Sequence, residues 1–310
     1  MDPAIIIFGF GIGAMVGMTG MGGGTLMTPL LILLFGVKPV TAIGTDIFYA
    51  AVTKTVGGWR HLRMRTVNLP LSFWMAAGSV PAAVGGVWAI SVLKGAVGEE
   101  RLDSIVYALL GGTLLMVGII TLARALILSH TIEERDDFEL QRRHKVAAVT
   151  IGAATGFVIG ITSAGSGTVI AILLIAVFRL TPIKVVGTDV FHAAILLWAA
   201  GLAHWVGGNV DFALAGNILL GSVPGVLVGS QFAARAPTGL LRTLLGIVLV
   251  ASGVVTVQKG DPVVWPVAAV VAGAGLTLLI WFPRWWNRRR LEREAQETDR
   301  SGDLAPDVIG

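Results

Sequence analysis

Two aspartates lie inside long apolar segments, and of all the side chains in the chain they could most readily do chemistry. Asp46 and Asp189 occupy the same motif, Gly-Thr-Asp-x-Phe, 143 residues apart. Each is about seven residues into an expected helix, on the order of 10 Å deep. A carboxylate at membrane depth costs several kcal/mol, so it indicates a site that carries a proton or binds an ion. The alternative is structural, an aspartate that stabilises its own Gly-Thr-Asp turn.

Two further polar side chains share the aspartate helices. Lys54 follows Asp46 at a distance of about 12 Å along a helix axis, which is too far for a direct pair. It either attracts a passing anion or extends its ammonium group to the cytoplasmic interface, and the second interpretation is preferred. His192 shares a helix face with Asp189 and could pair with it. Tyr49 stands at the matching place in the first half, so this pairing would be asymmetric.

These residues belong to an internal repeat without gaps. Residues 9–86 and 152–229 agree at 27 of 78 positions, and the shared residues include Gly, Pro, Thr, Ser and Asp as well as apolar types. A duplicated bundle with helix-breaking residues at matching places is typical of a transporter whose site lies between its halves.

Composition indicates a polytopic membrane protein. The chain has 310 residues, 55% apolar and only 14% charged, and apolar stretches long enough to span a bilayer recur along it. Cysteine is absent, which excludes disulfides and thiolate metal sites. Basic residues lie at helix ends, where membrane topology places them, so no nucleic-acid partner is expected. No catalytic motif is present, and neither an enzyme activity nor a cofactor is expected.

The predicted fold is all-α, with two inverted repeats, each containing a glycine-broken re-entrant helix, and one extra C-terminal helix. If each broken segment returns to its side of entry, 18 of 23 basic residues fall on one face and four on the other. The positive-inside rule then places the C-terminus in the cytoplasm and the N-terminus outside, in the cell (inner) membrane. The expected units are a first repeat at 1–128, a charged connector at 129–145, a second repeat at 146–258, an extra helix at 259–286 and a basic, then disordered, tail at 287–310.

The breaks at 20–24 and 163–167 are the expected binding elements. Non-helical backbone at membrane depth persists only where protein or water satisfies its polar groups. Each break opens a short helix whose free N–H groups and positive dipole end favour an anion. The alternative is a kink that relieves packing. The residues expected to bind substrate are Gly22, Gly23, Gly24, Thr25, Thr45, Gly165, Ser166, Gly167, Thr168 and Thr188.

The chain resembles the TauE/SafE family of sulfite exporters, also called the TSUP family. The resemblance rests on Gly17-Met-Thr-Gly-Met-Gly-Gly-Gly-Thr-Leu-Met-Thr-Pro29, on Pro39 with Gly44-Thr45-Asp46, and on a weaker echo in the second half. It covers about residues 5–257 and implies a carrier of small sulfur anions, such as sulfite or sulfoacetate, coupled to protons. The second half departs from the pattern, with Ala164 and Ser166 in place of Met21 and Gly23.

Three functions are therefore compared. The first is a secondary transporter of a small sulfur oxyanion that works by alternating access, with Asp46 or Asp189 carrying the proton and the lipid bilayer as its surroundings. The second is a cation carrier in which both aspartates stay ionised and bind a metal or Na⁺. The third is a membrane interaction protein that uses the charged connector and tail, and it leaves the repeated breaks unexplained.

Overall fold

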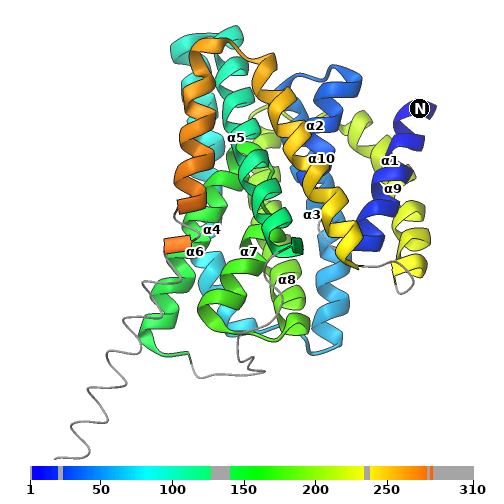
Figure 1. Cartoon of the computed structure of the whole chain (residues 1–310), viewed down its shortest axis with the longest axis vertical. Helices are drawn as coiled ribbons and strands as arrows, with labels where there is room; N and C mark the ends of the chain where they lie inside the picture. Colours follow the sequence, from blue (N-terminus) through cyan, green and yellow to red (C-terminus); the bar gives the residue numbers. More distant parts are fainter. Residues whose placement is uncertain (1, 20–23, 127–139, 234–237, 278–279, 282–310) are drawn as a thin grey trace, which may run out of the picture.

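The computed structural model describes residues 2–19, 24–126, 140–233, 238–277 and 280–281, and these residues form a bundle of packed helices (Figure 1). The helices of the first half are α1 (Pro3–Thr19), α2 (Gly24–Phe35), α3 (Pro39–Arg63), α4 (Leu69–Val97) and α5 (Glu99–Leu126). Those of the second half are α6 (Arg142–Thr162), α7 (Thr168–Leu173), the π-helix η1 (Leu174–Phe178), α8 (Pro182–Val206), α9 (Phe212–Ala233) and α10 (Thr238–Lys259). A 3₁₀ turn, η2 (Pro262–Val264), then leads into a further apolar helix that runs to Thr277.

Five of the described helices, α4, α5, α6, α8 and α9, are long and apolar enough to cross a bilayer, and shorter apolar helices accompany them. The expected all-α polytopic architecture is thus confirmed. Residues 129–139 of the expected connector and the whole of the expected tail at 287–310 lie outside the described residues. α6 begins at Arg142, inside the expected connector at 129–145, because the backbone N–H of Gln141 is held by Nδ1 of His144 at 3.3 Å and the helix starts there.

Local sequence signals explain where several helices begin. Proline stands in the first turn of α3, α4 and α8, where its missing N–H costs no hydrogen bond. The Asn68 side chain caps α4 by accepting from the N–H of Leu71 at 3.1 Å. Asp211 caps α9 in the same way, accepting from the N–H of Leu214 at 2.9 Å. The two caps stand 143 residues apart, so the repeat extends to the helix ends.

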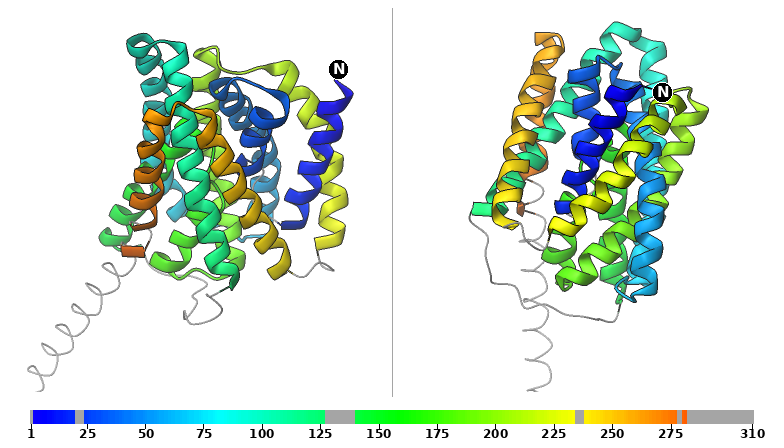
Figure 2. Two further views of the ribbon diagram at one scale, coloured as in Figure 1. Left: turned by 45° about the horizontal axis from the view of Figure 1, so that its top comes forward. Right: turned by 90° about the vertical axis from the view of Figure 1, so that its right-hand side faces the viewer.

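The halves exchange equivalent contacts. α1 packs along α9, and α6 packs along α4, as both views in Figure 2 show for α1 and α9. A Cβ added at Gly13 in α1 would fall on the carbonyl oxygen of Ser222 in α9, and one at Gly156 in α6 would fall on that of Ser79 in α4. Each contact becomes the other when 143 is added to one number and subtracted from the other. Small residues let these helix backbones touch, as is common between helices in lipid.

The two halves begin at opposite ends of the bundle. In Figure 1 the first residues of α1 lie at the top, and α6 starts near the bottom. α2 returns toward the end from which α1 entered, and α7 with η1 returns toward the start of α6. α2 and the segment α7–η1 thus run against the direction of the helix that precedes each of them.

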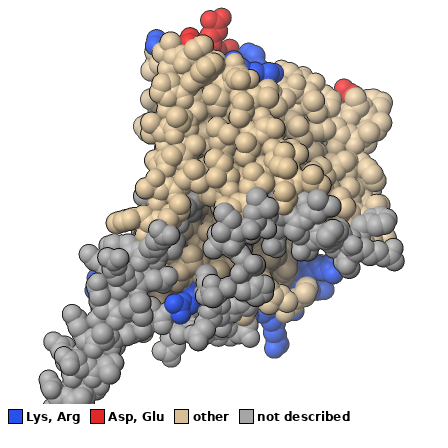
Figure 3. All heavy atoms as spheres, in the orientation of Figure 1, with Lys and Arg blue, Asp and Glu red and all other residues tan. Residues whose placement is uncertain are grey.

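On the face drawn in Figure 3, exposed charge lies at the two ends of the described bundle. In Figure 3 the side of the molecule is almost wholly tan, acidic residues are visible only at the upper end, and basic residues are visible at both ends. Large apolar side chains such as Ile7, Trp88 and Leu227 stand exposed on the flanks at 72%, 67% and 61%. An apolar belt with polar ends fits a bilayer.

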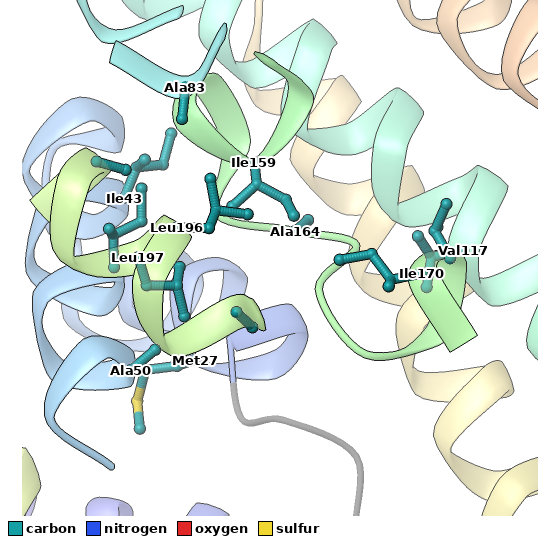
Figure 4. Packing of buried hydrophobic residues seen from close by; sticks show 14 of the residues in the cluster. Met27, Ile43, Ala50, Ala83, Val117, Ile159, Ala164, Ile170, Leu196 and Leu197 are labelled. Atoms are coloured by element: carbon teal, nitrogen blue, oxygen red, sulfur yellow. The ribbon is translucent and has the colours of Figure 1, made fainter. Parts of the chain in front are cut away.

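The core lies where the broken segments meet the long helices. Met27 of α2, Ile43 and Ala50 of α3, and Leu196 and Leu197 of α8 pack together (Figure 4). Ile159 and Ala164, from the end of α6 and the turn after it, adjoin the same cluster. The polar groups described next are therefore enclosed by apolar side chains.

Candidate functional site

Asp46 is the point at which both broken segments meet. Its side chain is fully buried in α3. Thr28 Oγ1 of α2 donates to Asp46 Oδ2 at 2.6 Å, and Ser163 Oγ, just after α6, donates to the same oxygen at 2.7 Å. Asp46 Oδ1 has no hydrogen-bond partner among the described residues. A carboxylate with two hydroxyl donors and one open oxygen can accept a proton or a ligand.

The second break is an irregular turn held in left-handed backbone conformations. Ser163 has φ +59°, Gly165 +102° and Gly167 +97°. The left-handed geometry at Ser163 aims its hydroxyl at Asp46 instead of continuing the helix. The turn brings three consecutive backbone N–H groups, those of Gly165, Ser166 and Gly167, in front of α7. The buried side chains of Ser166 and Thr168 adjoin this turn, and the binding of an anion by its amide groups stays a prediction.

The first break falls mostly outside the described residues, so Gly22 and Gly23 cannot be placed. Gly24 begins α2, and Thr25 is buried one residue further on.

Asp189 has a different neighbour. Its Oδ2 lies 3.7 Å from Nζ of Lys54, and both side chains are buried, with 7% and 8% of the aspartate and lysine side chains exposed. The expectation that Lys54 reaches the cytoplasmic interface was wrong, because the side chain points from α3 into the α3–α8 contact. With the halves exchanged, the equivalent pair would join Asp46 to the residue at position 197. That residue is Leu197, so Asp46 has no matching lysine partner.

The sequence suggested that His192 could pair with Asp189, but the two side chains form no such pair in the structure. Its Nε2 lies 2.8 Å from Oγ of Ser79 on α4, because α4 packs against α8 on this side. Its Nδ1 has no partner in the part of the chain that is described. With the halves exchanged, Tyr49 is equivalent to His192, and Ser222 is equivalent to Ser79.

Thr45 and Thr188 hold loops. Thr45 Oγ1 accepts from the backbone N–H of Asp211 at 3.0 Å, and Thr188 Oγ1 accepts from that of Asn68 at 3.0 Å. The two hydrogen bonds are equivalent, because each becomes the other when the two halves are exchanged. Each threonine thereby fixes the loop that starts α9 or α4, right beside an intramembrane aspartate.

A cavity of about 310 Å³ adjoins the second break. α5, α6 and α7 line it together with Gly275, and Ala164 and Gly165 form part of its wall. The other lining side chains are apolar apart from Thr150 and Thr155. Such walls suit an apolar group and offer no counter-charge to an anion. The described residues also contain no group of three His, Asp or Glu side chains that could hold a metal.

Sequence reasoning found both aspartates but missed two hydroxyl partners of Asp46 and the hydroxyl partner of His192. Thr28, Ser79 and the specific role of Ser163 follow from helix contacts across the bundle, more than 100 residues apart for Ser79 and Ser163. The repeat did not indicate a role for Thr28, because the equivalent residue in the second half is Ala171 and no shared polar residue marks the position.

A helical bundle with an apolar belt, broken helices and buried carboxylates defines a polytopic membrane protein of the transporter class. The family model described as "Sulfite exporter TauE/SafE" matches residues 5–256, and the chain belongs to that family.

Among similar proteins, the probable membrane transporter protein YjnA of Bacillus subtilis (strain 168) is 36% identical over 253 residues, covering 82% of this chain and 98% of YjnA. The probable membrane transporter protein YdhB of the same strain is 27% identical over 242 residues, covering 78% and 94%. No solved structure gives a significant match.

Proposed function

We propose that this protein is a secondary transporter that moves a small sulfur oxyanion, sulfite or an organosulfonate such as sulfoacetate, together with protons by alternating access. Family membership supports a membrane transporter of sulfite-type anions. The observation that carries the proposal is the shared bond to Asp46: Thr28 from one broken segment and Ser163 from the other both donate to its Oδ2. Two interrupted helices that converge on one buried carboxylate are the arrangement expected of a transport site.

The anion is held by amide and hydroxyl donors. Gly165, Ser166 and Gly167 offer backbone N–H groups, and Thr25 and Thr168 add side chains beside them. The glycine break at Gly22–Gly24 supplies the matching donors of the first half. Asp46 or Asp189 is protonated while the anion is bound, because a second buried negative charge at the site would be strongly unfavourable.

The two halves work as inverted repeats. The exchange of equivalent contacts between halves, together with the opposite ends at which α1 and α6 begin, supports this arrangement. The protein lies in the cell (inner) membrane with its N-terminus outside and its C-terminus in the cytoplasm. The basic residues at the lower end of the bundle support this orientation.

A cation carrier is the second candidate, and one observation favours it. Asp46 Oδ1 is open, and the Thr28 and Ser163 hydroxyl oxygens lie beside the same carboxylate, so oxygen ligands from three residues are close together. The positive charge of Lys54 beside Asp189 repels a cation, so it disfavours a cation site at the second carboxylate.

Reconstituted proteoliposomes decide between these functions. Sulfite should accumulate under an inward proton gradient, and sulfoacetate should compete with it. Asp46→Asn together with Asp189→Asn should keep anion binding and lose its pH dependence. A cation carrier would instead lose Na⁺ or metal binding in that variant. Absence of sulfite and sulfonate flux in folded wild-type protein, shown by a monodisperse elution profile, would refute the anion proposal.

A further inference from the structure

Lys54, Asp189 and His192 form a buried polar group, here called the Lys54 centre, whose hydrogen-bonding capacity is largely unused. Lys54 Nζ, Asp189 Oδ1 and His192 Nδ1 are all buried without a hydrogen-bond partner among the described residues. Asp189 and His192 are three residues apart on one face of α8, and Lys54 reaches them from α3. The three open atoms thus lie at one helix contact.

The Lys54–Asp189 pair is too long to be a hydrogen bond. Its atoms are 3.7 Å apart, whereas a charge-assisted N–H···O bond measures about 2.7–2.9 Å. An ammonium group has three donors, and burying them unpaired is costly. A small oxyanion carries a negative charge and several acceptor oxygens, so it could accept the hydrogen bonds that this ammonium group does not make.

We propose that the transported anion replaces Asp189 as the counter-ion of Lys54, and that Asp189 takes up one proton as it is displaced. The inference rests on the proposed function and assigns the coupling to one of the two aspartates. Before binding, the centre holds one ammonium and one carboxylate. Afterwards it holds the ammonium, a monovalent anion and a neutral carboxylic acid. Its net charge is the same in both states, so one proton accompanies one anion.

Among the residues that the structure describes, no other charged side chain pairs with Asp189. Of the helices packed against α8, α7 and η1 carry no titratable side chain, and α4 carries only Lys94 in its last turn. α6 carries its basic residues in its first turn. α3 contributes Lys54, with Asp46 two turns and Tyr49 one turn earlier, and carries Arg60, His61 and Arg63 in its last turn. α8 itself contributes His192, and it carries Lys184 in its first turn and His204 in its last turn.

The Asp46 surroundings cannot perform the same exchange. Its partners are the neutral hydroxyls of Thr28 and Ser163, and Leu197 stands where a second lysine would have to be. Asp46 therefore positions the second break, where amide and hydroxyl donors hold the anion. The Lys54 centre lies about two turns further along α3 and links anion to proton when the anion passes it during transport. Since Lys54 and Asp189 are both nearly inaccessible, an anion can reach them only after α3 and α8 separate locally.

Anion binding to the purified full-length protein tests the exchange. The probe is methanesulfonate, whose own charge does not change near neutral pH. Wild-type affinity should rise about tenfold for each unit that the pH falls, because one proton binds with each anion. Asp189→Asn should bind methanesulfonate with an affinity that no longer varies with pH and should be stabilised by the anion more than wild type is. Lys54→Gln should lose at least about tenfold in affinity, as expected for one charge-assisted contact.

Matched variants keep the test decisive. Lys38→Gln removes an exposed lysine that pairs only with Glu99 at the surface, and it should bind as wild type does. Lys54→Gln combined with Asp189→Asn removes both buried charges, so it should fold yet gain no stability from the anion. The exchange is overturned if Asp189→Asn keeps the pH slope, if Asp46→Asn alone abolishes it, or if Lys54→Gln binds normally. Failure of the wild type to bind sulfite or methanesulfonate would instead overturn the proposed function.

Discussion

The indole Nε1 of Trp198 donates a hydrogen bond of 2.7 Å to Oγ1 of Thr55, and the two residues hold the same position in the two halves of the chain. A residue can touch its own counterpart only near the axis that relates the halves. α3 and α8 therefore cross near this axis, and their crossing carries an exposed interhelical hydrogen bond. Lys54, which precedes Thr55, is consequently well placed to reach the other half.

Removing the Thr55 hydroxyl should weaken this crossing slightly. Thr55→Val leaves the Trp198 N–H without its acceptor, and interhelical hydrogen bonds in membranes contribute about 0.6 kcal/mol on average. Reversible unfolding in mixed detergent micelles should show a loss of about that size. Thr53→Val is the control, because Thr53 bonds only to carbonyls of its own helix. Equal losses in the two variants would contradict the interhelical bond.

Alanine at Gly156 should disrupt the contact between α6 and α4. Its Cβ would meet the carbonyl oxygen of Ser79, which is backbone and can move only with its helix. Overpacking of this kind costs about 1–3 kcal/mol or more, so a lower melting temperature in detergent and poor recovery are expected. Gly85→Ala is the matched control, because no atom lies within 4 Å of the Cβ built there and a helical glycine gains about 0.5–1 kcal/mol on replacement by alanine.

Loss of the Ser163 hydroxyl should affect both stability and transport. Ser163→Ala deprives a buried carboxylate of one of two donors, a change that typically costs about 1–3 kcal/mol. It also releases the second break from Asp46, so sulfite flux in proteoliposomes should fall. Ser91→Ala provides the comparison, since that hydroxyl bonds only to Val87 of its own helix at 3.4 Å. Unchanged flux with unchanged stability would show that the Ser163 bond has no role.

The orientation of the bundle can be tested directly because the chain has no cysteine. Glu100→Cys lies in the first turn of α5 at the upper end, and Arg63→Cys lies in the last turn of α3 at the lower end. A membrane-impermeant maleimide added to intact cells should label the first variant and not the second. Permeabilised cells should show labelling of both. The reverse pattern in intact cells would place the C-terminus outside.

The course of the helices was readable from the sequence, and the partners of the buried charges were not. Apolar runs and Gly or Pro punctuation gave most helix ends to within a few residues, as at Thr19 and Thr162. The repeat also predicted that Asp46 and Asp189 are equivalent, which holds for the backbone. Their side-chain neighbours differ because Thr28 and Lys54 have Ala171 and Leu197 as counterparts, and which helix faces which is decided by packing across the bundle.

The exchange of first helices bears on how such a chain could arise. α1 finds its packing partner in the second half and α6 finds its partner in the first, so neither half is complete alone. A gene for a single half would have produced a polypeptide that left a glycine-lined groove open until another copy filled it. Fusion of two such genes would then have joined subunits that were already assembled, and it freed each copy to acquire its own substitutions, as at Lys54.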